Sequence, residues 1–491
     1  MTGYPAIIQG GMGVAVSGWR LARTVSSLGH LGVVSGTAID MVLARRLQMG
    51  DPDGDVRRAM AAFPEPAVAD RILADYFVEG GIDDEKAFKA APMFTAEPHR
   101  RGLQLSTMAG FVEVWLAKEG HHGLVGINFL EKIQMPTPST LYGALLAGVD
   151  VVLVGAGIPR EIPRLLDLLG AHEPASLPLH VDGGDGVLAF DPRSVVPEPG
   201  APLQRPMFLA IIASTALAIS LARKTPGVNG FVIEGPTAGG HNAPPRGVVE
   251  LVDGEPLYGP RDEVDLEKVA ELGLPFWLAG GQATPERLRE AQEAGAAGIQ
   301  VGTAFAFCEE SGLDPVLRNR VLHEVRAGRI SIFTDPLASP TGFPFKVIEL
   351  EGTLSQDDVV QARERRCDLG YLRVPYTNPE GRLGYRCPAE PVEDYVRKGG
   401  DIADTVGRKC ICNGLTATIG LGQRRLGQPE PPIMTAGNDL VDLGRLLDAD
   451  RISYTAEDVV AYLLGEPLPA LDVEHVDAQH DDAGTAPVAP V

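Results

Sequence analysis

Short apolar runs recur along residues 1–310, and a helical pattern follows most of them. Eight such runs begin near residues 5, 31, 124, 149, 207, 230, 275 and 297. Their apolar residues follow one another without polar alternation, which is typical of parallel strands buried on both faces. Because strands and amphipathic helices alternate along the chain, the sequence predicts an α/β fold, a (β/α)₈ TIM barrel, over residues 1–310.

Two stretches interrupt this alternation inside the barrel. Residues 51–123, between the second and third predicted strands, carry scattered prolines and helical patterns at 67–77 and 110–118. We interpret them as an insertion, such as a lid. Residues 177–205 are rich in Gly, Asp and Pro and read as a further insertion, with a short extra strand at 179–181.

After the barrel the chain changes character. Residues 311–470 predict an irregular C-terminal extension with helices at 315–326 and 455–464. The segment 335–346 (DPLASPTGFPFK) holds three prolines and a glycine, so we expect an ordered loop that packs back on the barrel. The acidic tail, residues 471–491, is expected to be disordered.

The loop after the sixth predicted strand carries the first candidate chemistry. Residues 230–247 read GFVIEGPTAGGHNAPPRG, an apolar strand that leads into Glu234, a set of glycines and His241. Glycines let a backbone approach a ligand closely, and histidine exchanges protons near neutral pH. A turn with an incidental histidine, or a buried core histidine, is the alternative interpretation.

The next two predicted strands strengthen the functional interpretation. In residues 275–308, one strand ends at Gly280 and Gly281, and the next ends at Gly302 and Thr303, which open a short helical turn. Backbone N–H groups of glycine loops and a helix N-terminus bind anions, and TIM barrels place a phosphate site after strands 7 and 8. The spacing therefore predicts a phosphate cradle beside the histidine loop.

Two further segments point to the same end of the barrel. The first strand runs into Gly10-Gly11-Met12-Gly13, where a thioether can pack on an aromatic ring. The third ends at Asn128, whose amide needs a hydrogen-bonding partner when it is buried.

Composition narrows the class of protein. Among 491 residues, 43 are basic and 65 acidic, a net charge of −22, and no run of Lys or Arg suggests a nucleic-acid surface. Five cysteines do not indicate a secreted disulfide framework. No signal-like segment precedes the first predicted strand, and no apolar run approaches the roughly 20 residues of a membrane span, so we expect a cytoplasmic protein without a membrane partner.

Four cysteines fall in the extension: Cys367, Cys387, Cys410 and Cys412. They can supply a zinc or iron–sulfur site, but their spacing is wide and only the Cys-x-Cys pair is compact. We favour buried structural thiols and predict no metal site, at these cysteines or at His121-His122. A surface for a partner such as a carrier protein is another interpretation of the extension.

Seven motifs, in order, resemble the nitronate monooxygenase family, formerly called 2-nitropropane dioxygenases. They are IIQGGMG (7–13), LGVVSG (31–36), GINF (126–129), VVLVGAGIP (151–159), AGGH (238–241), AGGQ (279–282) and QVGTAF (300–305). The resemblance implies an FMN-dependent barrel, close to the flavin-dependent enoyl-acyl-carrier-protein reductases. The long extension is similar to relatives associated with polyketide and polyunsaturated fatty-acid synthesis.

The resemblance also assigns roles to residues. It makes His241 the catalytic residue, and it implies that the residues binding the cofactor are Gly11, Met12, Gly13, Asn128, Glu234, Gly239, Gly240, Gly280, Gly281, Gln300, Gly302 and Thr303. Glu234 stands where many members have Gln, and Thr237 where many have Glu, which puts the substrate in doubt more than the cofactor.

The sequence thus predicts an FMN-dependent oxidoreductase that oxidises alkyl nitronates or nitroalkanes with O₂. The alternative is an NAD(P)H-dependent flavin enoyl-thioester reductase of polyketide or fatty-acid synthesis, for which NAD(P)H and an acyl-carrier protein are the expected partners. FMN also fits the residues themselves, since they offer one anion cradle and no second glycine fingerprint for a dinucleotide.

Overall fold

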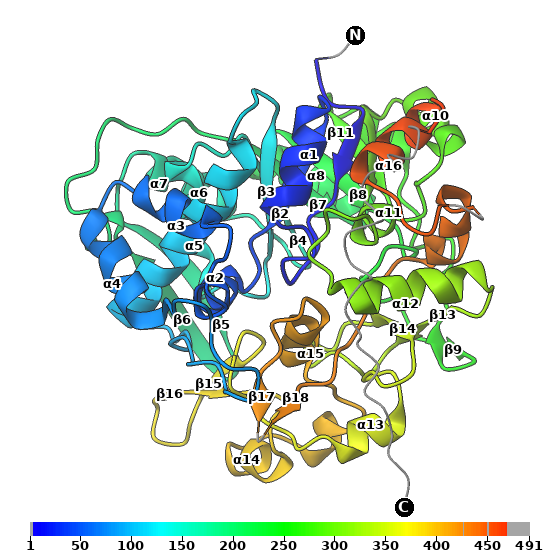
Figure 1. Cartoon of the computed structure of the whole chain (residues 1–491). Coiled ribbons are helices and arrows are strands. Elements are labelled where there is room, and N and C mark those ends of the chain that lie inside the picture. Colours follow the sequence, from blue (N-terminus) through cyan, green and yellow to red (C-terminus); the bar gives the residue numbers. More distant parts are fainter. Residues whose placement is uncertain (1–2, 426, 449–450, 469–491) are drawn as a thin grey trace, which may run out of the picture.

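Eight parallel strands close into a barrel in this computed structural model, which describes residues 3–425, 427–448 and 451–468 (Figure 1). Neighbouring strands follow the order β1-β12-β11-β8-β7-β4-β3-β2. The predicted TIM barrel is confirmed, and each strand lies where an apolar run was read. The barrel strands are β1 (Ile7–Gln9), β2 (Leu31–Ser35), β3 (Val125–Leu130), β4 (Val151–Gly155), β7 (Met207–Ile212), β8 (Gly230–Glu234), β11 (Phe276–Ala279) and β12 (Gly298–Val301).

The strands lack polar alternation because both of their faces are buried. Side chains such as Val33, Leu153 and Trp277 fill the barrel interior, while Phe231 and Ile127 pack beneath the surrounding helices. A buried indole needs a hydrogen-bond acceptor, and Trp277 donates to the carbonyl of Pro5 at 2.8 Å.

Helices cover the outside of the barrel, and the last of them comes from the end of the described chain. The short α11 (Thr303–Ala306) follows β12 directly, while α16 (Ala456–Leu464) packs against both α1 and α10 and so takes the place of the eighth barrel helix. The other covering helices are α1 (Trp19–Ser27), α2 (Ile39–Gln48), α5 (Arg100–Lys118), α6 (Thr137–Leu146), α7 (Ile162–Gly170), α8 (Thr215–Lys224), α9 (Leu266–Ala270) and α10 (Pro285–Glu293).

The segment between the second and third barrel strands packs on the outside of the barrel. It contains α3 (Asp55–Ala61), α4 (Pro66–Tyr76) and α5, and α5 lies against α6 and α2. Among the residues that line the large cavity described below, none falls between 51 and 123. The interpretation of this insertion as a lid is therefore wrong: its apolar positions are used to cover the barrel wall.

The second interruption forms an antiparallel hairpin, β5 (Ala175–Val181) and β6 (Gly184–Phe190), so the extra strand expected at 179–181 is present. Between β8 and β11 lies a smaller hairpin, β9 (Leu251–Val252) and β10 (Glu255–Pro256). In the part of the chain that the structure describes, no helix is long and apolar enough to cross a membrane.

Residues 357–429 of the extension, drawn in yellow and orange in Figure 1, gather on one side of the barrel. The extension shares a small core with the barrel loops, in which Val14, Ala38 and Ile133 meet Phe345 and Ile433. Its elements are α12 (Pro315–Arg326), β13 (Ser331–Asp335), β14 (Phe345–Glu349), α13 (Asp357–Ala362), β15 (Val374–Thr377), β16 (Leu383–Arg386), α14 (Val392–Arg397), α15 (Ile411–Thr418), β17 (Arg424–Arg425) and β18 (Gln428–Pro429). The tail expected to be disordered lies outside the described residues.

Candidate active site

One cavity of about 240 Å³ opens at the carboxyl ends of the barrel strands. The loops after β1, β3, β8, β11 and β12 line it from the barrel side, and the extension lines it from the other. The structure brings the candidate catalytic residue and all the candidate cofactor-binding residues to this cavity: Gly11, Met12, Gly13, Asn128, Glu234, Gly239, Gly240, His241, Gly280, Gly281, Gln300, Gly302 and Thr303.

The extension holds His241 in place. The backbone around it pairs with the loop at 335–346: Lys346 N–H donates to the Gly240 carbonyl at 3.0 Å, and His241 forms a bridge with Phe345. The imidazole Nε2 lies 2.6 Å from Ser339 Oγ, and its ring centroid is 4.8 Å from that of Phe345. The proline-rich loop therefore packs back on the barrel, as the sequence predicts, and it does so on the candidate catalytic residue.

His241 is a neutral imidazole at neutral pH. Burial and the nearby Lys132 ammonium lower its pKa to about 4, because both oppose a second positive charge. Lys132 sits over the ring of Phe343, with Nζ 3.2 Å from the ring centroid, and burial lowers its pKa to about 8. A lysine with that pKa remains largely cationic at pH 7, so a positive charge lies near the uncharged histidine, although Lys132 itself does not line the cavity.

Glu234, at the end of β8, is the second titratable group of the cavity. Burial raises its pKa to about 7, because a carboxylate loses hydration there. Near neutral pH both the protonated acid, which can donate a proton, and the carboxylate, which can accept one, are therefore populated.

Two amide oxygens in the cavity wall are buried and lack a hydrogen-bonding partner among the described residues: Asn128 Oδ1 and Gln300 Oε1. The Asn128 amide nitrogen donates to the Gly11 carbonyl at 3.2 Å. A side chain at Gly11 would clash, since an added Cβ would lie 2.2 Å from Asn128 Cγ. A buried hydrogen-bond acceptor without a partner destabilises the protein unless a ligand donates to it. These two oxygens fit a flat ring with N–H groups at its edge, such as a flavin.

The two glycine loops that the sequence predicts to form a phosphate cradle follow neighbouring strands and line the cavity. Gly280 and Gly281 follow β11, and Gly302 and Thr303 follow β12. Thr284 caps α10, its Oγ1 accepting from the Arg287 N–H at 3.1 Å. However, the helix that Thr303 opens has only four residues, so its dipole adds little and the N–H groups of the loops must supply most of the attraction for an anion.

A segment of the extension that the sequence did not indicate, an irregular stretch leading into the 3-10 helix η3 (Asn438–Leu446), lies on these loops. The Gly437 N–H donates to Thr303 Oγ1 at 2.9 Å, and Asp439 also hydrogen-bonds to Thr303. Thr435 Oγ1 accepts from the Gly240 N–H at 2.8 Å. Burial raises the pKa of Asp439, which lines the cavity close to where a phosphate is expected.

Comparisons with known proteins agree with the resemblance read in the sequence. The model of the family described as nitronate monooxygenase matches residues 202–334. The chain is 31% identical over 172 residues to a nitronate monooxygenase of Pseudomonas aeruginosa, which covers 35% of this chain and 44% of that protein. It is 32% identical over 96 residues to a probable nitronate monooxygenase of Bacillus subtilis, covering 20% and 26%. The chain thus spans less than half the length of these curated relatives.

Solved structures with a similar arrangement are more distant. FabK from Thermotoga maritima is 15% identical with a TM-score of 0.45, covering 94% of this chain and 92% of that one. A nitroalkane oxidase from Streptomyces ansochromogenes is 15% identical with a TM-score of 0.46, covering 94% and 95%. The resemblance of the sequence to the nitronate monooxygenases, a flavin-dependent family of oxidoreductases, is confirmed by the family model and the curated relatives.

Proposed function

We propose that this chain is an FMN-dependent oxidoreductase of the nitronate monooxygenase type, which oxidises alkyl nitronates with O₂. The observation that carries the proposal is the cavity at the carboxyl ends of the strands, where a neutral histidine and two glycine loops line one space and the Lys132 ammonium lies near that histidine. FMN, when bound, supplies the centre that accepts electrons from the substrate.

Several residues fit FMN itself. Asn128 and Gln300 offer the unpaired acceptors for the edge of a ring, and the loops at Gly280 and Gly302 offer N–H groups for a phosphate. Met12 lies beside Gly302, its sulfur 3.7 Å from where a Cβ of that glycine would stand, so its thioether is available to pack on the ring.

The Lys132 ammonium near His241 favours an anionic substrate at that residue. His241, with a pKa of about 4, is a weak base for removing the α-proton of a neutral nitroalkane. A nitronate has already lost that proton. His241 then needs only to donate a hydrogen bond to a nitronate oxygen, while Lys132 balances the negative charge. The hydroxyl of Ser339, 2.6 Å from Nε2, fixes the orientation of the imidazole for that contact.

The test is O₂ consumption by the FMN-loaded chain with an alkyl nitronate and, separately, with the matching neutral nitroalkane. We expect the nitronate to be consumed at least about tenfold faster, and His241→Asn to lose most of that rate. His180→Asn, a change at a histidine whose side chain is 82% exposed, is the matched control and should keep it. No O₂ consumption with nitronate, or equal rates for the neutral nitroalkane, contradicts the proposal.

Glu234 favours a second candidate, reduction of an enoyl thioester with NAD(P)H. That reaction needs a proton donor, and a buried carboxylic acid with a pKa of about 7 is suited to it. If the chain is an enoyl-thioester reductase, Glu234→Gln should abolish reduction of an enoyl thioester. If it oxidises nitronates, the same variant should keep most of its activity, because the neutral glutamine does not repel the anionic substrate.

A further inference from the structure

Four of the five cysteines meet around one small internal cavity outside the active site. Cys367, Cys387, Cys410 and Cys412 all line it, although they come from three separate segments of the extension. One segment precedes β15, one follows β16, and one begins α15. The fifth cysteine, Cys308, is buried in the barrel core, and all five are free thiols.

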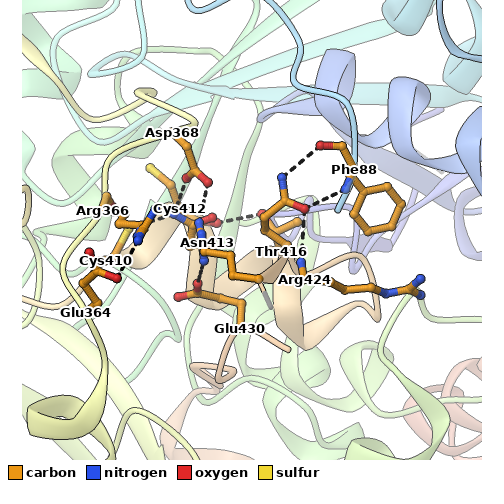
Figure 2. A network of polar contacts seen from close by, with 12 residues as sticks. Phe88, Glu364, Arg366, Asp368, Cys410, Cys412, Asn413, Thr416, Arg424 and Glu430 are labelled. Atoms are coloured by element: carbon orange, nitrogen blue, oxygen red, sulfur yellow. Dashed lines mark hydrogen bonds and ion pairs between the residues drawn. The ribbon is translucent and has the colours of Figure 1, made fainter. Parts of the chain in front are cut away.

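N–H groups are directed at three of the four sulfurs. The Asn413 amide donates to Cys410 Sγ at 3.4 Å, as the network in Figure 2 shows. Backbone N–H groups donate to the other two, that of Ala389 to Cys387 and that of Leu372 to Cys412. Hydrogen bonds from N–H groups stabilise a thiolate relative to a thiol and are a regular feature of sulfurs that ligate metals.

The polar network of Figure 2 fixes the orientation of Asn413. Its Nδ2 also donates to Asp368 Oδ1 at 2.7 Å, and Asp368 is in turn paired with Arg425. Arg425 and Arg363 both pair with the buried Glu430. An amide held by a buried charge network keeps its N–H directed at Cys410, which is the kind of support that sulfur ligands have in metal sites.

One carboxylate oxygen beside the four sulfurs is left without a partner in the described part of the chain. Glu390 also lines this cavity, and its Oε1 has no hydrogen-bonding partner among the described residues although Lys398 pairs with the other oxygen at 2.7 Å. An unpaired carboxylate oxygen beside four sulfurs is better satisfied when a cation is bound among them.

We propose that Cys367, Cys387, Cys410 and Cys412 together ligate one metal centre. The ligand chemistry is that of a thiophilic metal bound by four thiolates, which either a zinc ion or an iron–sulfur cluster supplies. Within residues 3–425, 427–448 and 451–468, no group of three or more metal-ligating side chains is yet placed to hold an ion. Binding must therefore draw the sulfurs inward around the cavity, which orders the three loops.

The position of the cluster links it to the active site. Leu372, Ile411 and Cys412 line both this cavity and the large one. The surrounding loops have little regular structure of their own, so a metal that joins them contributes directly to the folding of the extension. The centre would thereby support the wall that faces the candidate cofactor.

The test is metal and sulfide analysis of the full chain purified without oxygen, together with reconstitution by Zn²⁺ alone and by Fe²⁺ with sulfide. We expect one centre per chain: either about one zinc, or iron with matching acid-labile sulfide and visible thiolate-to-iron absorption. Cys410→Ser should lose most of the metal, and Cys308→Ser, the matched control, should keep it.

A second measurement on the unaltered chain remains informative even when a variant fails to fold. Removal of the metal by a chelator should release about four additional reactive thiols per chain, counted with a thiol reagent under native conditions. A chain that neither contains nor takes up either metal overturns the proposal, as does equal loss of metal in both variants or a disulfide among the four cysteines.

Discussion

Gly280 and Gly295 provide a matched pair of substitutions that separates backbone strain from a role in the site. Both adopt a positive φ, +86° for Gly280 and +88° for Gly295. Gly280 lies in the loop after β11 at the cavity, whereas Gly295 lies between α10 and β12, away from it. Alanine at either position strains the backbone by about 1–2 kcal/mol.

The two positions differ in the space that a side chain would meet. A Cβ at Gly280 would lie 3.0 Å from Ala238 N, 3.0 Å from Thr237 Oγ1 and 3.2 Å from the Gly235 carbonyl oxygen, all closer than ordinary contacts. A Cβ at Gly295 would meet nothing within 4 Å. Overpacking of this kind costs about 1–3 kcal/mol. Together with the backbone strain, we expect Gly280→Ala to lower the free energy of unfolding by about 2–5 kcal/mol, and Gly295→Ala to lower it by about 1–2 kcal/mol.

The clash at Gly280 falls on the loop that leads to Gly239 and His241, so it should also alter the cavity. We expect Gly280→Ala to weaken FMN binding at least about tenfold, which corresponds to about 1.4 kcal/mol. Gly295→Ala should leave binding within about twofold of the unaltered chain. Urea unfolding of the FMN-free protein measures the stability difference, and quenching of FMN fluorescence measures affinity. Equal losses of affinity in both variants, or none in Gly280→Ala, would refute the assignment of this loop to the cofactor.

Three further predictions concern charge and orientation in the cavity. The pKa of Glu234 is raised from 4.5 to about 7 in the folded chain, so the free energy of unfolding of the FMN-free chain should fall as pH rises from 4.5 to above 7, by at most roughly 3 kcal/mol. Glu234→Gln should remove this pH dependence from the free energy of unfolding measured in urea. Asp439→Asn should tighten FMN binding by up to about tenfold, because it removes a carboxylate beside the phosphate cradle. If the variant and the unaltered chain bind FMN with equal affinity throughout pH 5–8, that would argue against a phosphate there. Ser339→Ala removes one hydrogen bond to His241, so it should lower kcat about fivefold and shift the pH profile of kcat, with little change in KM. Thr341→Ala leaves the contact between Ser339 and His241 intact, so it is the control and should show neither effect.

The barrel and the loops at its carboxyl ends could be predicted because their signals are local. A strand such as Phe276–Ala279 can be recognised by its apolar run, and the glycines of its loop follow directly in the chain. Parallel strands of one barrel then bring such loops together without further information. The position of His241 at the cavity follows from the same logic.

The contribution of the extension could not be predicted, because it rests on contacts between distant residues. Ser339 is 98 residues from His241, and Thr435 is 195 residues from Gly240. A single Ser or Thr in a loop carries no sign of its partner. The use of α16 as the eighth barrel helix is hidden in the same way, since its apolar face is compatible with any buried surface.

The long α5 illustrates an error of a different kind. Its apolar residues were read as part of an insertion over the site, but buried positions such as Leu105, Met108 and Phe111 face the barrel wall and neighbouring helices. Periodicity identifies the face that is buried, not the surface that buries it.

The most direct measurement is anaerobic stopped-flow absorbance of the FMN-loaded chain, mixed separately with an alkyl nitronate and with NADPH or NADH. We expect rapid loss of the oxidised flavin bands with the nitronate and none with either pyridine nucleotide. Bleaching by a pyridine nucleotide with the nitronate inert would instead support the enoyl reductase. A chain that binds no FMN at all would contradict the central claim that the cavity at the carboxyl ends of the barrel strands is a flavin site.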